Sequence, residues 1–225
     1  MSWLRLYITV EGHAEKDFAD NALAPHLLNF NIEVKPRVVV TNRKLGKRGG
    51  ILDFAKIQGD LNRLMKQDRQ PEARFTTMID FYALPQEFPG WEEAQRKNAP
   101  IQKVQALEQS LYACFGDPRF CPYIQLHEFE ALLYCDLKQL QLRLANSERG
   151  VKALQLEVDH LQPEDINNGA HTAPSKRIIN HVPVYERSKV RVGAAAAAAI
   201  GLPTLRARCP HFNDWLARLE QLAEK

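Results

Sequence analysis

The sequence lacks both the long apolar runs of a membrane protein and the paired cysteines of a disulfide-rich one. No apolar stretch reaches the roughly 18–20 residues that span a bilayer, and Glu11, Glu15 and Asp17 come too early for a secretory leader. The four cysteines are irregularly spaced and include no C-x-x-C pair, which favours reduced thiols over a disulfide framework. We therefore expect a cytoplasmic protein without a membrane segment.

A strong net charge is also missing, because the 225 residues carry a formal charge of only +3. Charge alone therefore does not indicate nucleic-acid binding. Basic residues nevertheless gather in two places, namely Arg43, Lys44, Lys47 and Arg48 in a glycine-containing loop, and Lys176, Arg177 and Lys189 further along the chain. Such groups contact phosphates, although many are simply solvated. We predict that both bind phosphate or nucleic acid, with a solvated surface as the alternative.

The hydrophobic pattern predicts an α/β fold. Leu4, Leu6, Ile8 and Val10 alternate with Arg5, Tyr7 and Thr9, which is typical of a strand. Further strands are expected over 33–40, 75–81 and 120–126, and helices from about 14, over 51–65, over 100–115 and from 127. Strands that alternate with helices form a mainly parallel sheet.

Strand signals fade after Asp136. Helices are expected there over 137–144, 151–161, 175–179, 193–200 and 211–223. We therefore predict an α/β core over residues 1–136 and a mostly helical C-terminal extension over 137–225 that packs on it.

Carboxylates fall at the predicted ends of three strands. Glu11, Asp80 and the pair Glu128 and Glu130 all lie where the strand pattern stops. Because the carboxyl ends of parallel strands share one edge of the sheet, these side chains are expected to converge. Converging carboxylates repel one another unless they share protons or a cation, and Mg²⁺ prefers such oxygen ligands. Metal-assisted phosphodiester cleavage follows from this pattern; the alternative is that each carboxylate only caps a helix.

Several local motifs together resemble a known family. They are VEGHAE at 10–15, DFY at 80–82, LHEFEALLY at 126–134, TAPSKRI at 172–178, YER and SK within 185–189, and IGLPTLRARCPHFNDWL at 200–216. These look like the motifs of the domain-of-unknown-function family 4276, which resembles TOPRIM-type proteins such as the RloB and OLD-family nucleases. The resemblance covers nearly the whole chain.

The resemblance implies a TOPRIM-like α/β fold with a helical extension and a site for Mg²⁺ or Mn²⁺. By that resemblance Glu11, Asp80 and Glu130 are catalytic metal-site residues, with Glu128 as a further ligand. It also implies an ATPase partner, because such proteins are often found beside ATPases in anti-phage systems. One departure matters: TOPRIM enzymes usually have D-x-D at the third strand, whereas here Tyr82 stands in the place of the second Asp. Glu15 or Glu128 compensates, or the site binds one ion or none.

Accessory roles are predicted for residues beside these motifs. His127 is a candidate for orienting a phosphate or acting as a general acid, with a structural histidine as the alternative. Tyr82 is a candidate for stacking on a base. Lys176 and Arg177 follow Pro174 at a predicted helix start, where an anion can bind.

The leading hypothesis is a cytoplasmic, Mg²⁺-dependent TOPRIM-like nuclease that acts on DNA or RNA, with or without an ATPase partner. The second is a non-catalytic TOPRIM-like subunit that binds an ATPase or nucleic acid, and the third is a small-molecule phosphotransfer or nucleotide-binding enzyme. The sequence does not fix the oligomeric state, so a homo-oligomer remains open.

Overall fold

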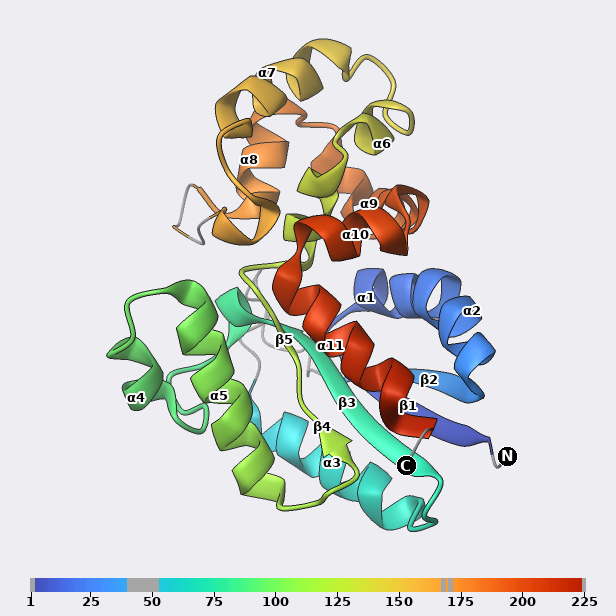
Figure 1. Cartoon of the computed structure of the whole chain (residues 1–225). Helices are drawn as coiled ribbons and strands as arrows, with labels where there is room; N and C mark the ends of the chain where they lie inside the picture. Colours follow the sequence, from blue (N-terminus) through green and yellow to red (C-terminus); the bar gives the residue numbers. More distant parts are fainter. Residues whose placement is uncertain (1–2, 40–52, 167–168, 170–171, 224–225) are drawn as a thin grey trace.

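The computed structural model describes residues 3–39, 53–166, 169 and 172–223. Its centre is a five-stranded sheet in the order β2-β1-β3-β4, with β5 also paired to β3. The strands are β1 (Leu4–Val10), β2 (Ile32–Val38), β3 (Ala73–Asp80), β4 (Phe120–Cys121) and β5 (Ile124–Gln125). All pairings are parallel. The predicted α/β fold with a mainly parallel sheet is therefore confirmed (Figure 1).

Alternation along β1 decides which side of the sheet each residue faces. Leu4, Leu6, Ile8 and Val10 are buried in one core cluster, whereas Tyr7 packs against a second cluster on the other face. Burying apolar side chains on both faces removes them from water, which is the main force that holds such a sheet between layers of helices. The period of two in the sequence thus predicted this strand correctly.

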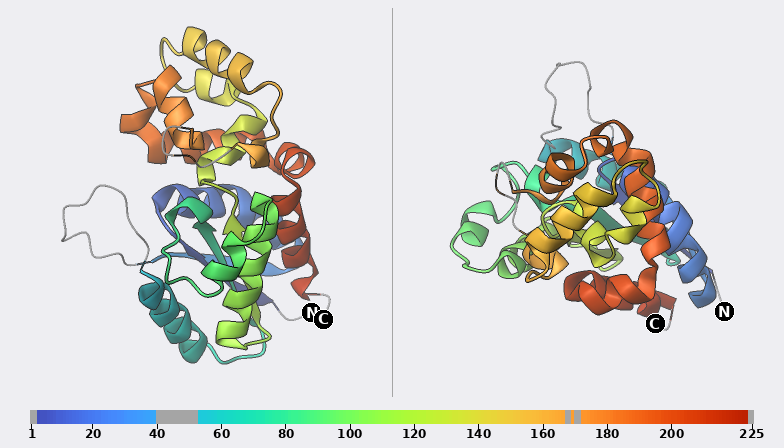
Figure 2. Two further views of the ribbon diagram at one scale, coloured as in Figure 1. Left: turned by 90° about the vertical axis from the view of Figure 1, so that its left-hand side faces the viewer. Right: turned by 90° about the horizontal axis from the view of Figure 1, so that it is seen from above.

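Helices cover both faces of the sheet. One face carries α1 (His13–Phe18), α2 (Ala24–Leu27) and α11 (Pro210–Glu220), with a π-helical turn at Ala19–Leu23 that joins α1 to α2. The other face carries α3 (Phe54–Gln67) and α5 (Pro100–Phe115), with the short α4 (Trp91–Gln95) beside α5. Figures 1 and 2 show these layers.

The C-terminal half is helical, as predicted. It contains α6 (Lys138–Gln141), α7 (Glu148–Val158), α8 (Pro174–His181), α9 (Tyr185–Ile200) and α10 (Leu202–Arg208). These helices form the upper part of the molecule in Figure 1, and α9 lies against α1. None of the helices within the described ranges combines the length and apolar character that crossing a bilayer requires.

Several details differ from the sequence prediction: α9 begins at Tyr185 and not at 193, and α10 was not predicted. The strand expected over 120–126 is split into β4 and β5, because Pro122 has no N–H to donate and the N–H of Tyr123 donates to the Thr77 hydroxyl instead, at 2.9 Å. The segment from 127 does not open an α-helix. It forms a 3₁₀ run at Phe129–Cys135, labelled η5 here, after a left-handed residue at His127 (φ 63°).

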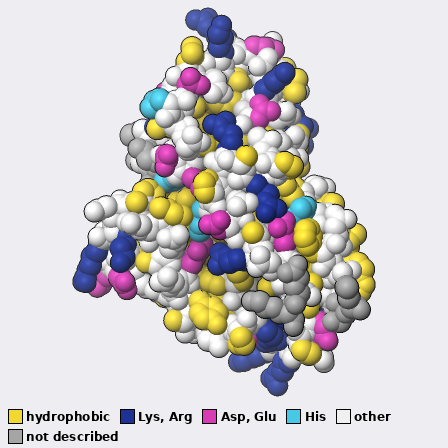
Figure 3. All heavy atoms as spheres, in the orientation of Figure 1, with side chains coloured by type: hydrophobic (Ala, Val, Ile, Leu, Met, Phe, Trp, Pro, Cys, Tyr) yellow, Lys and Arg dark blue, Asp and Glu magenta, His cyan; other side chains and the backbone are white. Residues whose placement is uncertain are grey.

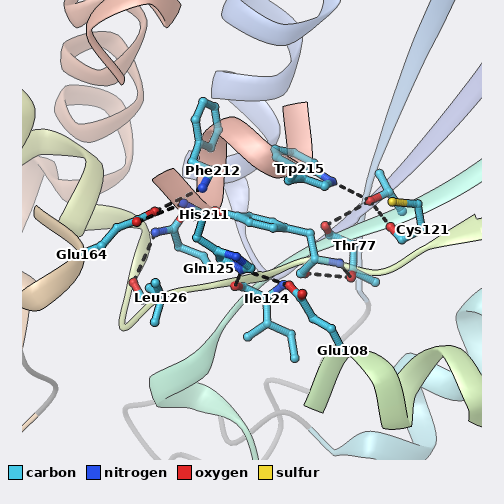
Figure 4. Close-up of polar contacts among 12 residues, drawn as sticks. Thr77, Glu108, Cys121, Ile124, Gln125, Leu126, Glu164, His211, Phe212 and Trp215 are labelled. Atoms are coloured by element: carbon cyan, nitrogen blue, oxygen red, sulfur yellow. Dashed lines mark hydrogen bonds and ion pairs between the residues drawn. The ribbon is translucent and has the colours of Figure 1, made fainter. Parts of the chain in front are cut away.

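The last helix is bonded into the sheet and closes the core. The indole Nε1 of Trp215 donates to the Thr76 hydroxyl at 2.9 Å, and the Trp215 ring stacks on Tyr123 at a centroid distance of 4.2 Å. Nε2 of His211 donates to Glu108 on α5 at 3.0 Å, as Figure 4 shows. One core cluster therefore contains residues from both halves of the chain.

Candidate functional site

The carboxylates at the ends of β1 and β3 lie beside each other. These strands are parallel neighbours with Val10 opposite Met78, so Glu11, directly after β1, and Asp80, the last residue of β3, reach the same edge of the sheet. The backbone N–H of Asp80 stabilises the ionised carboxylate of Glu11 and so acts to lower its pKa, which means that the two residues lie close together. Glu15 on α1 joins them, because its charge acts on both.

Burial and mutual repulsion keep protons on this cluster. Burial first and the charge of Glu15 second raise the pKa of Glu11 to about 8, while the Asp80 backbone N–H and Lys189 oppose the rise. Burial also raises the pKa of Glu15 to about 7. The pKa of Asp80 is raised well above its ordinary value, first by burial and then by the charges of Glu11, Glu15 and Glu130. Carboxyl groups whose pKa values are driven up in this way are typical of functional sites.

The segment η5 brings Glu130 to the same place. The Glu130 side chain is 2% exposed, and its Oε1 accepts a hydrogen bond from the Tyr185 hydroxyl at 3.1 Å. The Lys189 ammonium lies 3.2 Å from the same oxygen. Burial raises the pKa of Glu130, and Lys189 acts against that rise. Figure 3 shows acidic and basic side chains next to one another where the helical part meets the sheet part.

The alternative that these carboxylates only cap helices holds for some of them. Glu128 Oε2 accepts from the backbone N–H of Ser175 at 2.8 Å, in the first turn of α8, which is a capping contact. Asp80 Oδ1 accepts from the N–H of Phe129 at 2.9 Å and so fixes the start of η5. Glu11 caps no helix: the start of α1 has no side-chain cap, and Oε2 of Glu11 is buried without a hydrogen-bond partner among the described residues. Such an orphaned oxygen is costly unless a ligand satisfies it.

Gly12 has a steric role that the sequence pattern did not reveal. Its backbone is extended at φ −143°, so the turn does not use the left-handed region that glycine favours. A Cβ at this position would lie 3.0 Å from Oε2 of Glu15. Gly12 therefore leaves room for the Glu15 carboxylate to lie close to the backbone of the turn.

His127 is a structural support for this site. It is fully buried, and its Nε2 donates to the backbone carbonyl of Glu164 at 2.9 Å. Burial lowers its pKa, so the ring is neutral near pH 7 and does not supply a charged general acid there. Its own carbonyl accepts from the N–H of Tyr82 at 2.9 Å, and the Tyr82 side chain is 46% exposed beside the site.

The predicted phosphate-binding residues have different environments. Lys189 lies in the carboxylate cluster, whereas the guanidinium of Arg177 pairs with Glu157 and donates to the Thr172 carbonyl. Lys176 is exposed on α8. The loop cluster Arg43, Lys44, Lys47 and Arg48 lies outside the described residues.

Sequence reasoning missed the role of two residues on α9. Tyr185 is fully buried and bonds Glu130, and Gly193 approaches the Tyr185 hydroxyl closely. The available signal was their spacing: Tyr185, Lys189 and Gly193 follow one another at intervals of four, which places them on one face of a helix.

The donor chemistry of the cluster fits a hard divalent cation, because such ions prefer carboxylate oxygens. The unpartnered buried oxygen of Glu11 and the raised pKa of Asp80 agree with that fit. Within the described ranges, no group of three or more His, Cys, Asp or Glu side chains is already gathered to hold a metal ion. Glu11 and Asp80 are thus the best-placed ligands, since Glu128 caps α8 and Glu130 is paired with Lys189.

A cavity of about 680 Å³ lies elsewhere, between α5 and α11. Glu108, His211 and Arg218 are among its lining residues, and none of the strand-end carboxylates is. The cavity is therefore separate from the carboxylate cluster.

A family model matches nearly the whole chain. It is described as Domain of unknown function (DUF4276) and covers residues 10–220, which include the strand ends, η5 and α9. No curated protein and no solved structure matches the chain.

Proposed function

The chain belongs to the DUF4276 family, and we propose that it is a metal-dependent, TOPRIM-like nuclease that cleaves phosphodiester bonds. The observation that carries the proposal is the group of Glu11, Glu15 and Asp80, whose pKa values are all raised by burial and then by the charge of a neighbouring acidic side chain. A folded protein that buries so many acidic groups together loses stability by doing so, which is expected where the groups serve a ligand.

The side chains of the cluster have different roles in the proposed reaction. Glu11 and Asp80 would hold Mg²⁺ or Mn²⁺, which when bound activates water and stabilises the leaving oxygen. Glu15, with a pKa of about 7, is matched to accepting a proton from water near neutral pH. Lys189 carries the positive charge in the cluster that would meet the substrate phosphate, and Lys176 lies exposed on α8 for the adjoining backbone.

A second candidate is a non-catalytic subunit that binds an ATPase or nucleic acid. Two observations favour it: Tyr82 stands where TOPRIM enzymes usually have an Asp, and Glu130 is already neutralised by Lys189. The resemblance to RloB and OLD-family proteins supports an ATPase partner in either case, in an anti-phage setting.

A cleavage assay separates these candidates. Plasmid, single-stranded DNA and total RNA would each be incubated with the protein in Mg²⁺, in Mn²⁺ and in chelator. We expect metal-dependent cleavage that Asp80→Asn lowers at least 100-fold, as expected for removal of a catalytic metal ligand. The matched control is Asp159→Asn, an exposed Asp at the end of α7, which should cleave like the wild type.

The other outcomes point to the alternatives. Absence of cleavage under every condition, including with a candidate ATPase and ATP, would support the binding subunit. Turnover of free nucleotides without cleavage of any polymer would support a small-molecule enzyme. Equal cleavage by Asp80→Asn would refute the assigned site.

A further inference from the structure

Three residues of α9 form a stripe that faces Glu130. Tyr185, Lys189 and Gly193 are spaced four apart and so share one side of the helix. The Tyr185 hydroxyl donates to Oε1 of Glu130 at 3.1 Å, and the Lys189 ammonium lies 3.2 Å from the same oxygen. Two donors on one oxygen hold the buried carboxylate in a single orientation.

Gly193 is an unexpected residue at its position. It lies inside α9 and is followed by six alanines, although glycine is the poorest helix former after proline. Its φ is not in the left-handed region, so backbone conformation does not require glycine there. The available space requires it, because a Cβ at 193 would lie 2.8 Å from the Tyr185 hydroxyl oxygen, closer than a Cβ carbon packs against another atom.

The other atoms near that Cβ would tolerate it. The next distances are 3.8 Å to Cε1 of Phe129 and 3.9 Å to Cζ of Tyr185, which are ordinary van der Waals contacts. Of these three nearest atoms, only the hydroxyl oxygen conflicts with the added Cβ. Because Tyr185 is fully buried, its ring has little freedom to move aside without losing the bond to Glu130.

We propose that Tyr185 is a positioning residue for Glu130, and that residue 193 is glycine so that the Tyr185 hydroxyl can reach this carboxylate. The proposal rests on the proposed function and adds Glu130, which the family resemblance gives as a metal-site residue, as a further ligand beside Glu11 and Asp80. Second-layer hydrogen bonds of this kind orient ligands and commonly change metal affinity 10–100-fold. The Tyr185–Glu130 bond would thus set the orientation of Glu130.

The steric half of the proposal is tested by thermal unfolding. Gly193→Ala is expected to lower Tm, and adding Tyr185→Phe, which removes only the conflicting oxygen, is expected to recover most of the loss. Gly59→Ala is the matched control, because Gly59 is exposed inside α3 and has nothing within 4 Å of the added Cβ. That control should raise Tm. A rise in Tm for Gly193→Ala as well would overturn the steric argument.

The positioning role of Tyr185 needs a measurement that a change in packing alone would not alter. Mn²⁺ binding would be measured by calorimetry from pH 6 to pH 9 for wild type, Tyr185→Phe and Glu130→Gln. We expect Tyr185→Phe to weaken binding about ten-fold and to shift its pH midpoint upward, because the lost hydrogen bond favoured the ionised carboxylate. An unchanged affinity and midpoint in Tyr185→Phe would refute the positioning role even if the wild type cleaves nucleic acid.

A separate measurement keeps the two proposals distinguishable. NMR of the Glu130 side-chain carboxyl carbon follows its titration in the metal-free protein, with no requirement for cleavage. Tyr185→Phe should raise the midpoint of that titration, whereas Tyr112→Phe, an exposed tyrosine on α5, should leave it in place. If the wild type neither binds Mn²⁺ nor cleaves, the nuclease proposal fails, and an unmoved titration would reject the Tyr185 proposal independently.

Discussion

Replacing Glu11 with Gln is expected to stabilise the metal-free protein at alkaline pH. The pKa of Glu11 rises from its ordinary 4.5 to about 8 in the folded protein, chiefly because of burial and then because of Glu15. The folded state therefore holds a proton that the unfolded state has already released between these values. Since the unfolded state binds fewer protons in this window, the free energy of unfolding falls as pH rises from about 4.5 to about 8.

The size of the effect follows from the same two pKa values. Each pKa unit corresponds to about 1.4 kcal/mol, so complete ionisation of Glu11 alone would cost at most about 5 kcal/mol. Gln at this position stays buried and polar, so part of the desolvation cost remains in the variant. We therefore expect Glu11→Gln to raise the free energy of unfolding by about 2–3 kcal/mol at pH 8.5 and by less than about 0.5 kcal/mol at pH 5.

The assay is urea unfolding followed by circular dichroism, in chelator, at pH 5, 7 and 8.5. Glu87→Gln is the matched control, because this glutamate is exposed in the loop before α4. Its unfolding free energy should follow the wild type at every pH. If Glu11→Gln gave the same difference at pH 5 and pH 8.5, the proton-linked repulsion inferred for this cluster would be wrong.

Three further predictions concern residues that stabilise the fold around the site, and each is tested by urea unfolding. The Asp68 carboxylate accepts hydrogen bonds from Arg5 and Tyr7, and these bonds, chiefly that of Arg5, lower its pKa to about 2. Asp68→Asn should therefore lower the free energy of unfolding by about 1 kcal/mol at pH 7 and not at all below pH 2. An equal loss at the two pH values would contradict this. Trp215→Phe removes the bond to Thr76 and should cost about 1–2 kcal/mol, whereas no loss would refute its role. Gly90 has φ 78° and a Cβ there would lie 2.1 Å from the Ser110 hydroxyl oxygen, so Gly90→Ala should cost at least about 2 kcal/mol. A neutral result would show that the loop can rearrange.

The sequence was sufficient for the three longer strands of the sheet and for the first part of the site. The alternation in β1 and the buried run in β3 depend on local periodicity, and parallel pairing then brings the residues at their ends together. That is why the convergence of Glu11 and Asp80 was predictable. The membership in the DUF4276 family, inferred from short motifs, is confirmed over residues 10–220.

The rest of the site depends on contacts between distant parts of the chain. Nothing local to Glu130 indicates that Tyr185 and Lys189 bond it, and nothing local to Glu128 indicates that it caps α8. The pairing of Arg177 with Glu157 likewise arises only when α7 and α8 pack together. The hydrophobic periodicity assigns such residues to helices or strands, but it does not predict which helices and strands pack against one another.

Titration of Mn²⁺ into the metal-free protein at pH 8 tests the central claim most directly, because it requires no knowledge of the polymer or the partner. Calorimetry in two buffers of different ionisation enthalpy would report both affinity and proton release. We predict binding that releases protons, since Glu11 and Glu15 have pKa values of about 8 and about 7, and we predict that Asp80→Asn abolishes it while Asp159→Asn does not. Absence of binding by the wild type, or equal binding by Asp80→Asn, would contradict a cation site at the ends of β1 and β3.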